Sequence, residues 1–200
     1  MSVVVAIKAD NKVYIGSDSQ VTKGGTRTTL KNENNYKIWK VLNVDHCLMG
    51  QVGYVRDGNV VRLIDDLVTG YDIYNDAVNY SFVVKRITPY IISTLKEYGF
   101  IKDEKYFDFM ESSFFFAYKD HLYVIGTDAS VIEIEDCAAI GSGSDQAIGS
   151  LLSTVGEDPE TRIIKAIKAS AASDIYVDYP IIISNTEDTT FKIINEVDVK

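Results

Sequence analysis

The sequence predicts an α+β fold, a four-layer αββα sandwich in which two mainly antiparallel sheets are flanked by helices. Two observations predict it: strands occur in consecutive runs joined by tight turns, and pairs of helical segments separate these runs. Strands joined by hairpins are antiparallel, because the chain reverses direction at each turn. Two such sheets can bury their apolar faces against each other while helices cover the outer faces. The length of 200 residues fits a single domain, residues 1–200.

The first run of strands contains two predicted hairpins. Its strands are expected at residues 3–8, 12–17, 36–41 and 46–50. Asp10 and Asn11 form the first turn, since both residue types tolerate the positive φ that a two-residue hairpin turn requires. Residues 18–35, between the two hairpins, are rich in Gly, Thr and Asn and predict a polar loop.

Helical spacing of apolar residues follows the first four strands. Residues 60–67 and 84–98 predict a first pair of helices. Pro89 is expected to kink the second helix of this pair or to mark a late start, and Gly99 is expected to end it.

A second helix pair is predicted near the C-terminus. Ser144 is expected to cap a helix that runs to about residue 155, and Asp158 followed by Pro159 is a strong start signal for another. The remaining strands are expected at residues 113–118, 121–126, 131–134, 138–140, 179–184 and 190–194.

Composition excludes several classes of protein. The net charge is −9, which argues against a nucleic-acid partner and against adsorption to anionic membranes, because both require a basic surface. No apolar run reaches the length of a membrane span, and the N-terminus does not resemble a signal peptide. Cys47 and Cys137 have no metal-binding spacing and form no disulfide framework. We therefore expect a cytoplasmic protein without a metal ion or other cofactor.

Two local motifs offer weak functional signals. Cys47, next to His46, lies between apolar neighbours in a predicted strand, and cysteines in such positions are usually structural. The glycine-rich segment 141–144 precedes a helix and could bind an anion, but it lacks the lysine of a phosphate-binding loop.

The N-terminus carries a more specific possibility. Methionine before a small residue is normally removed, so removal of Met1 is expected to expose Ser2 with both a hydroxyl and a free α-amine. An α-amine has an ordinary pKa of roughly 7.7–8.0 and can act as general base for a neighbouring hydroxyl.

Several motifs together resemble a known family. They are Ser2–Lys8, Lys12–Gln20, Tyr36–Ile38, Leu48–Gly53 and Ala138–Gly143. In this order and spacing they are similar to proteasome β-type subunits, closest in style to the bacterial HslV peptidase and to proteasome-like proteins of bacteria and their phages. The resemblance covers roughly residues 2–184. It implies an N-terminal-nucleophile (Ntn) hydrolase with the same αββα sandwich.

The resemblance also implies a role for individual residues. Ser2 would be the nucleophile, in place of the usual threonine, and its own α-amine would be the base. Lys37 would keep that amine deprotonated and stabilise developing negative charge. Asp18 would hold Lys37 by a charge-assisted hydrogen bond.

Three further residues would complete the catalytic site that the resemblance implies. The backbone N–H of Gly50 would bind the oxyanion. Ser142, in the glycine-rich turn, and Asp174, at the end of the last helix, would orient the α-amine.

The leading hypothesis is a proteasome-like peptidase that cleaves polypeptides through an acyl intermediate on Ser2. The family implies a ring-shaped homo-oligomer and a possible ATPase unfoldase partner. Two alternatives remain open: a catalytically inactive proteasome-like subunit with a structural or assembly role, and a small-molecule amidohydrolase on the same fold.

Overall fold

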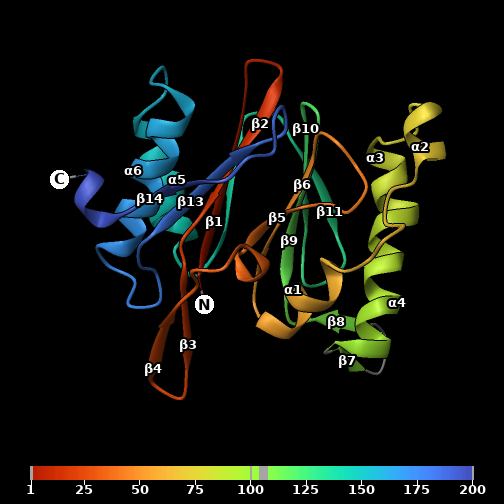
Figure 1. The fold of residues 1–200 in the computed structure, drawn as a ribbon, viewed down its shortest axis with the longest axis horizontal. Coiled ribbons are helices and arrows are strands. Elements are labelled where there is room, and N and C mark those ends of the chain that lie inside the picture. The colour runs from red at the N-terminus through yellow and green to blue at the C-terminus, as the bar shows by residue number, and fades with distance from the viewer. Residues whose placement is uncertain (1, 100, 104–107, 200) are drawn as a thin grey trace.

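The computed structural model describes residues 2–99, 101–103 and 108–199. Its centre consists of two antiparallel five-stranded sheets (Figure 1). The first sheet has the order β12-β1-β2-β13-β14, with strands Cys137–Gly141, Val3–Ala9, Lys12–Ser17, Ile181–Asn185 and Lys192–Ile194. The second sheet has the order β11-β10-β9-β6-β5, with strands Val131–Ile134, His121–Ile125, Ser113–Tyr118, Cys47–Val52 and Ile38–Lys40.

Helices cover the outer face of each sheet, as Figure 1 shows. α5 (Ser144–Ser153) and α6 (Pro159–Ala171) lie on the first sheet, whereas α4 (Thr88–Tyr98) lies on the second. Shorter helices are α1 (Val55–Val61), α2 (Gly70–Tyr74) and α3 (Tyr80–Phe82). No helix in the described part of the chain is long and apolar enough to cross a membrane. The predicted α+β fold with two antiparallel sheets and flanking helices is thus confirmed.

Strand β1 is buried on both faces, which explains its continuous apolar sequence. Val3 and Val5 pack against α6 residues such as Ile163, whereas Val4 packs between the sheets against residues such as Phe115. Alternate side chains of a strand point to opposite faces, so each face of β1 contributes to a different core.

The first hairpin forms as predicted, whereas the loop that follows it contains an additional hairpin. Asp10 and Asn11 both have positive φ, at 55° and 57°. Within residues 18–35, where a loop was expected, β3 (Gln20–Lys23) pairs with β4 (Thr26–Thr29). All four residues of β4 are exposed, so the hairpin has none of the apolar alternation by which strands are recognised.

The first helix pair also differs from the prediction. A helix was expected at residues 60–67, but α1 begins at Val55 and ends at Val61, and the apolar side chains of Ile64 and Leu67 are buried from a turn instead. Helical spacing of apolar residues indicates that they are buried on one side of the segment. A compact turn can bury them in the same way.

The second predicted helix starts earlier and contains a π-helical segment. α3 continues through π-helical residues Val83–Ile87 into α4, so that Pro89 lies at the beginning of α4. α4 ends at Tyr98, and Gly99 is its C-cap, as predicted. A proline cannot donate a backbone hydrogen bond, and the start of a helix is where this is tolerated.

The starts of α5 and α6 differ in how they are capped. Gly143, not Ser144, is the N-cap of α5, and no side chain caps this helix. Asp158 caps α6 by accepting a hydrogen bond from the Thr161 N–H, as its sequence predicted. Two short strands close to α4, β7 (Ile101–Asp103) and β8 (Asp108–Met110), were not predicted.

Candidate active site

Ser2 lies at the start of β1 beside a cavity. The residue is only 6% exposed, and the cavity has a volume of about 600 Å³. Residues from β3, from the segment before β5 and from the turn before α1 line it. In Figure 1 the letter N marks this end of β1, between the β3–β4 hairpin and α1. Segments that are far apart in the sequence therefore meet at Ser2.

Asp18 forms a buried junction between the start of β1 and Lys37. Its Oδ1 atom accepts hydrogen bonds from Lys37 Nζ at 2.7 Å and from the Val3 N–H at 3.0 Å. Its Oδ2 atom accepts one from the Gln20 N–H at 3.0 Å. Asp18 is fully buried and Lys37 is 7% exposed. The carboxylate thus holds the lysine cation next to the residue that follows Ser2.

The ammonium group of Lys37 is fixed by a second acceptor, the carbonyl oxygen of Gln20, at 2.6 Å. Burial lowers the pKa of Lys37 below its ordinary value, because removal from water disfavours the charged form. The Asp18 carboxylate raises the pKa of Lys37 by stabilising the cation and so opposes the effect of burial. The charge of Asp174 also raises this pKa, but more weakly. A buried, oriented cation of this kind interacts strongly with charge that develops beside it.

The turn between β12 and α5 holds the backbone of Ser2. The N–H of Ser2 donates to Ser142 Oγ at 3.2 Å, and Ser142 Oγ donates to the Ser2 carbonyl oxygen at 3.4 Å. The Gly143 N–H donates to the same oxygen, also at 3.4 Å. Gly141 has φ +105°, and a side chain there would overlap the Ser2 carbonyl. This turn therefore requires glycine where it approaches the start of β1.

Asp174 lies just beyond the end of α6 and is linked to the same turn through Ser170. The Asp174 N–H donates to the Ser170 carbonyl, and Ser170 Oγ donates to the Gly143 carbonyl at 2.7 Å. Asp174 Oδ1 accepts a hydrogen bond from the Tyr176 N–H, while Oδ2 is buried and has no hydrogen-bond partner among the described residues. Asp174 is thus near enough for its charge to affect the pKa of Lys37.

Of the predicted site residues, Ser2 and Lys37 line the cavity, whereas Gly50 does not. It lies inside β6, paired with Ile38 on one side and Phe115 on the other. A Cβ at Gly50 would come within 3.0 Å of Val4 and Ile15, so its missing side chain allows close packing of the two sheets. The oxyanion role of Gly50 remains a prediction that this position does not favour.

Gly53 does line the cavity, at the turn between β6 and α1. Its φ is +126°, and a Cβ there would lie 2.5 Å from the carbonyl oxygen of Glu111. Both observations require glycine at this position. The sequence offered one signal for it, a second glycine three residues after Gly50 in the same motif.

A buried polar network that was not predicted fixes this turn. Ser112 Oγ donates to Asp57 Oδ2 at 2.7 Å and accepts from Gln51 Nε2 at 2.9 Å and from the Tyr54 N–H at 3.2 Å. Gln51 Nε2 also donates to the Tyr54 carbonyl at 3.0 Å. Fully connected buried networks hold a single geometry, so the backbone around Gly53 is rigidly positioned beside Ser2.

Replacing Gly53 by alanine is expected to lower the free energy of unfolding by about 2 kcal/mol, since the new Cβ requires a strained φ and displaces the Glu111 backbone. Urea denaturation measures this change. Gly149→Ala, within α5, is the matched control: nothing lies near its added Cβ, and alanine favours the helix by roughly 0.5–1 kcal/mol. If the Gly53→Ala variant were as stable as the original protein, position 53 would not require glycine.

Comparison with known proteins identifies the family. The model of the proteasome subunit family matches residues 2–179 of this chain. The ATP-dependent protease subunit HslV of Campylobacter lari is 30% identical over 152 residues, which cover 74% of this chain and 73% of the relative. HslV of Caldicellulosiruptor saccharolyticus is 27% identical over 177 residues, which cover 86% and 91% of the two chains.

Solved structures share the fold. The BPH protein of Thiobacillus denitrificans in complex with epoxomicin has a TM-score of 0.69 at 18% identity, with 94% of this chain and 99% of that chain covered. The Anbu (Gly-1) mutant from Hyphomicrobium has a TM-score of 0.71 at 15% identity, with 100% and 90% covered. The extent of the sequence match and the shared architecture establish that this chain belongs to the proteasome subunit family.

Proposed function

We propose that this protein is a peptidase whose nucleophile is Ser2, exposed as the first residue when Met1 is removed. Met1 itself lies outside the described residues. The observation that carries the proposal is the Asp18 junction, in which one carboxylate oxygen binds both Lys37 Nζ and the Val3 N–H. It holds a buried cation at the start of β1, next to a cavity that Ser2 lines.

The proposed reaction has two steps. The Ser2 hydroxyl oxygen bonds to the carbonyl carbon of the substrate while the α-amine of Ser2 takes the hydroxyl proton. The C–N bond of the substrate then breaks, and the departing amine receives that proton. In the second step a water molecule, activated by the same α-amine, attacks the ester on Ser2, which releases the acid product and restores the hydroxyl.

Neighbouring groups support each charge change in this scheme. The cation of Lys37 favours the neutral, basic form of an α-amine beside it. Ser142 Oγ already contacts the backbone nitrogen of Ser2, so it is placed to orient the amine. Asp174 is assigned a positioning role through the charge of Lys37.

We assign the oxyanion contact to the backbone of the β6–α1 turn at Gly53. Gly53 lines the same cavity as Ser2, and the Gln51–Ser112–Asp57 network holds the turn in place. Backbone N–H groups that are fixed before reaction stabilise an oxyanion without reorganisation. Gly50, whose backbone is enclosed by paired strands, is the less favoured candidate.

We propose the assembly of this protein from its membership of the proteasome subunit family. The HslV relatives are subunits of ATP-dependent proteases, and we extend to this chain a ring-shaped homo-oligomer, a polypeptide substrate and an ATPase unfoldase partner. A reducing cytoplasm suits the buried free thiol of Cys47, the pKa of which burial raises strongly.

Acylation by a peptide β-lactone tests the nucleophile. Ring opening by Ser2 adds the whole reagent as an ester with no leaving group, so intact mass spectrometry should show loss of Met1 and one adduct per chain. Peptide mapping should place the adduct on Ser2. Ser2→Ala should remain unmodified, whereas Ser2→Thr, which keeps a hydroxyl, should be acylated.

The same samples separate the alternatives. Turnover of fluorogenic peptides supports a peptidase, and turnover confined to small amides supports an amidohydrolase instead. A chain that retains Met1, takes no adduct and hydrolyses neither substrate would be a structural subunit, and the proposed mechanism would be wrong.

A further inference from the structure

The cavity beside Ser2 carries a local charge opposite to that of the whole protein. The chain has a net charge of −9, yet Lys23, Arg56 and Arg62 line this cavity in addition to Lys37. Among the described residues around it, Glu111 is the only acid. Since Asp18 neutralises Lys37, the other lining charges leave an excess of positive charge.

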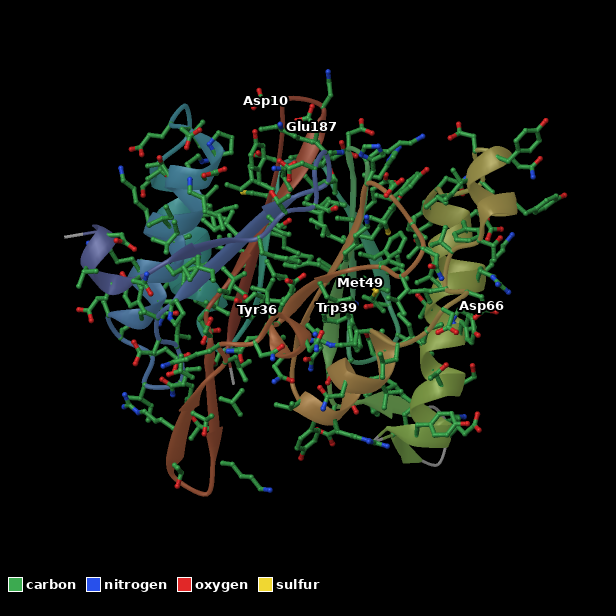
Figure 2. All side chains as sticks on the ribbon, viewed as in Figure 1. Asp10, Tyr36, Trp39, Met49, Asp66 and Glu187 are labelled. Atoms are coloured by element: carbon green, nitrogen blue, oxygen red, sulfur yellow. The ribbon has the colours of Figure 1, made fainter. Side chains whose placement is uncertain are left out.

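Besides Lys37, Arg62 is the most buried of the cations named above. Its guanidinium donates to the backbone carbonyls of Asn34 at 2.5 Å, Tyr36 at 2.5 Å and Gly58 at 3.2 Å, and it stacks on Trp39 at 4.8 Å from the ring centre. Tyr36 and Trp39, labelled in Figure 2, lie together at the centre of the molecule.

No carboxylate of the described residues pairs with Arg62. Burial lowers the pKa of its guanidinium to about 10, with no acidic neighbour to oppose the shift. Carbonyl dipoles hold the group in place but leave its full charge uncompensated. A half-buried charge in this state attracts an anion more strongly than an exposed one does, because less water screens it.

Where the cavity meets α1, polar side chains lie in its wall beside the apolar Val52 and Val55. Gln51 places its side-chain amide beside Gly58, where an added Cβ would lie 2.8 Å from Gln51 Oε1. Asn35 and Asn59 contribute two further amides. Arg56 is exposed, and its Nε donates to the Tyr98 carbonyl at 2.8 Å, which fixes a second guanidinium at the rim. The amides of Asn35 and Asn59 and the guanidinium of Arg56 supply hydrogen-bond donors suited to a carboxylate, whereas Gln51 Nε2 already donates to Ser112 and Tyr54.

We propose that this cavity receives the substrate side chain next to the cleaved bond, on its acyl side, and selects a carboxylate, so that the protein cleaves after Asp or Glu. The inference rests on the proposed function, because it assigns a substrate class to the same site. A basic side chain would meet the excess positive charge and be rejected, whereas an apolar side chain would leave that charge without a counter-charge.

The test compares capped fluorogenic tripeptides that differ only in the last residue: Glu, Leu or Lys. We expect kcat/KM for the Glu peptide to exceed that for the Leu peptide by about tenfold and that for the Lys peptide by about a hundredfold. Arg56→Gln and Arg62→Gln should each reduce the Glu-to-Leu ratio by roughly fivefold or more, and added salt should reduce it in the original protein.

Matched variants distinguish charge from folding. Arg27→Gln removes an exposed arginine of β4 that does not line the cavity, so the ratio should stay unchanged. Arg62→Lys keeps the charge and should recover part of the preference. If Arg62→Gln does not fold, Arg56→Glu decides the question, since it removes the excess positive charge of the lining and should bring kcat/KM for the Glu and Lys peptides close together.

Binding to the Ser2→Ala variant separates failure of this inference from failure of the proposed function. Fluorescence anisotropy with labelled peptide amides ending in Glu, Leu or Lys measures selection without hydrolysis. Preferred binding of the Glu peptide by a protein that hydrolyses nothing would support the cavity's selectivity while the peptidase proposal fails. Hydrolysis with a preference for Leu or Lys would leave the peptidase in place and overturn the selectivity.

Discussion

Replacing Lys37 by alanine is expected to reduce kcat/KM for peptide hydrolysis by about a thousandfold. Lys37 is the cation that Asp18 holds beside the start of β1. Without it, the α-amine of Ser2 loses the charge that favours its basic form, and the transition state loses a fixed positive neighbour. The measurement is steady-state hydrolysis of a fluorogenic peptide, together with the rate of acylation by a β-lactone.

Lys40→Ala is the matched control for Lys37→Ala. Lys40 lies on the same strand, β5, but its side chain is exposed and pairs with Asp45 at 3.0 Å. Its removal should leave kcat/KM within twofold. If Lys37→Ala and Lys40→Ala behaved alike, the assignment of Lys37 would be wrong.

A structural effect of Lys37→Ala must be separated from the chemical one. Removing one member of a buried ion pair leaves the other uncompensated, at a cost of about 3 kcal/mol in the free energy of unfolding. The double variant Lys37→Met, Asp18→Asn contains neither charge and should be more stable than Lys37→Ala. It should remain inactive, which shows that activity depends on the cation and not on stability alone.

The pH dependence of kcat/KM gives a second readout of Lys37. Activity should rise as the α-amine loses its proton and fall as Lys37 loses its own. Because burial lowers the pKa of Lys37, the falling limb should lie below the ordinary value of 10.5. Between the lowered pKa and 10.5 the unfolded chain binds the lysine proton more tightly than the native one, so this group's contribution to stability increases with pH in that window.

The sequence predicts those parts of the fold that depend on local chemistry. Asp10 and Asn11 were sufficient for the first hairpin, because a two-residue turn restricts backbone φ at just these positions. Asp158 and Pro159 likewise defined the start of α6. The exposed β4 was not predicted, since its pairing with β3 buries little apolar surface and leaves no periodic pattern.

The family motifs predict which side chains meet at the start of β1, whereas the turn that long-range packing holds there could not be predicted. Asp18 accepts a hydrogen bond from Lys37 Nζ at 2.7 Å, and Ser142 Oγ accepts one from the Ser2 N–H at 3.2 Å. The motif does not show which of Gly50 and Gly53 is the better candidate for the oxyanion contact. That choice depends on the Glu111 carbonyl, which a strand connection far along the chain brings against Gly53.

A segment fused before Ser2 is expected to abolish hydrolysis, with a loss of about a thousandfold or more. Fusion converts the α-amine into an amide, and an amide nitrogen has no basic lone pair to accept the hydroxyl proton. The Asp18–Lys37 pair and the Ser142 turn would remain intact, because the fusion leaves Lys37 Nζ and the Ser2 carbonyl unchanged and an amide N–H of Ser2 can still donate to Ser142 Oγ. The loss should therefore occur without a change in the free energy of unfolding.

Controlled removal of the fused segment makes this result specific. A protease that cleaves directly before Ser2 should restore hydrolysis in proportion to the fraction of chains that begin with Ser2, as measured by intact mass. The same segment at the C-terminus, which Figure 1 shows well away from the start of β1, should have no effect. Full activity in the uncleaved fusion would eliminate the α-amine as the base. Loss of activity that cleavage does not reverse would show that the fusion disturbs the fold or the assembly instead.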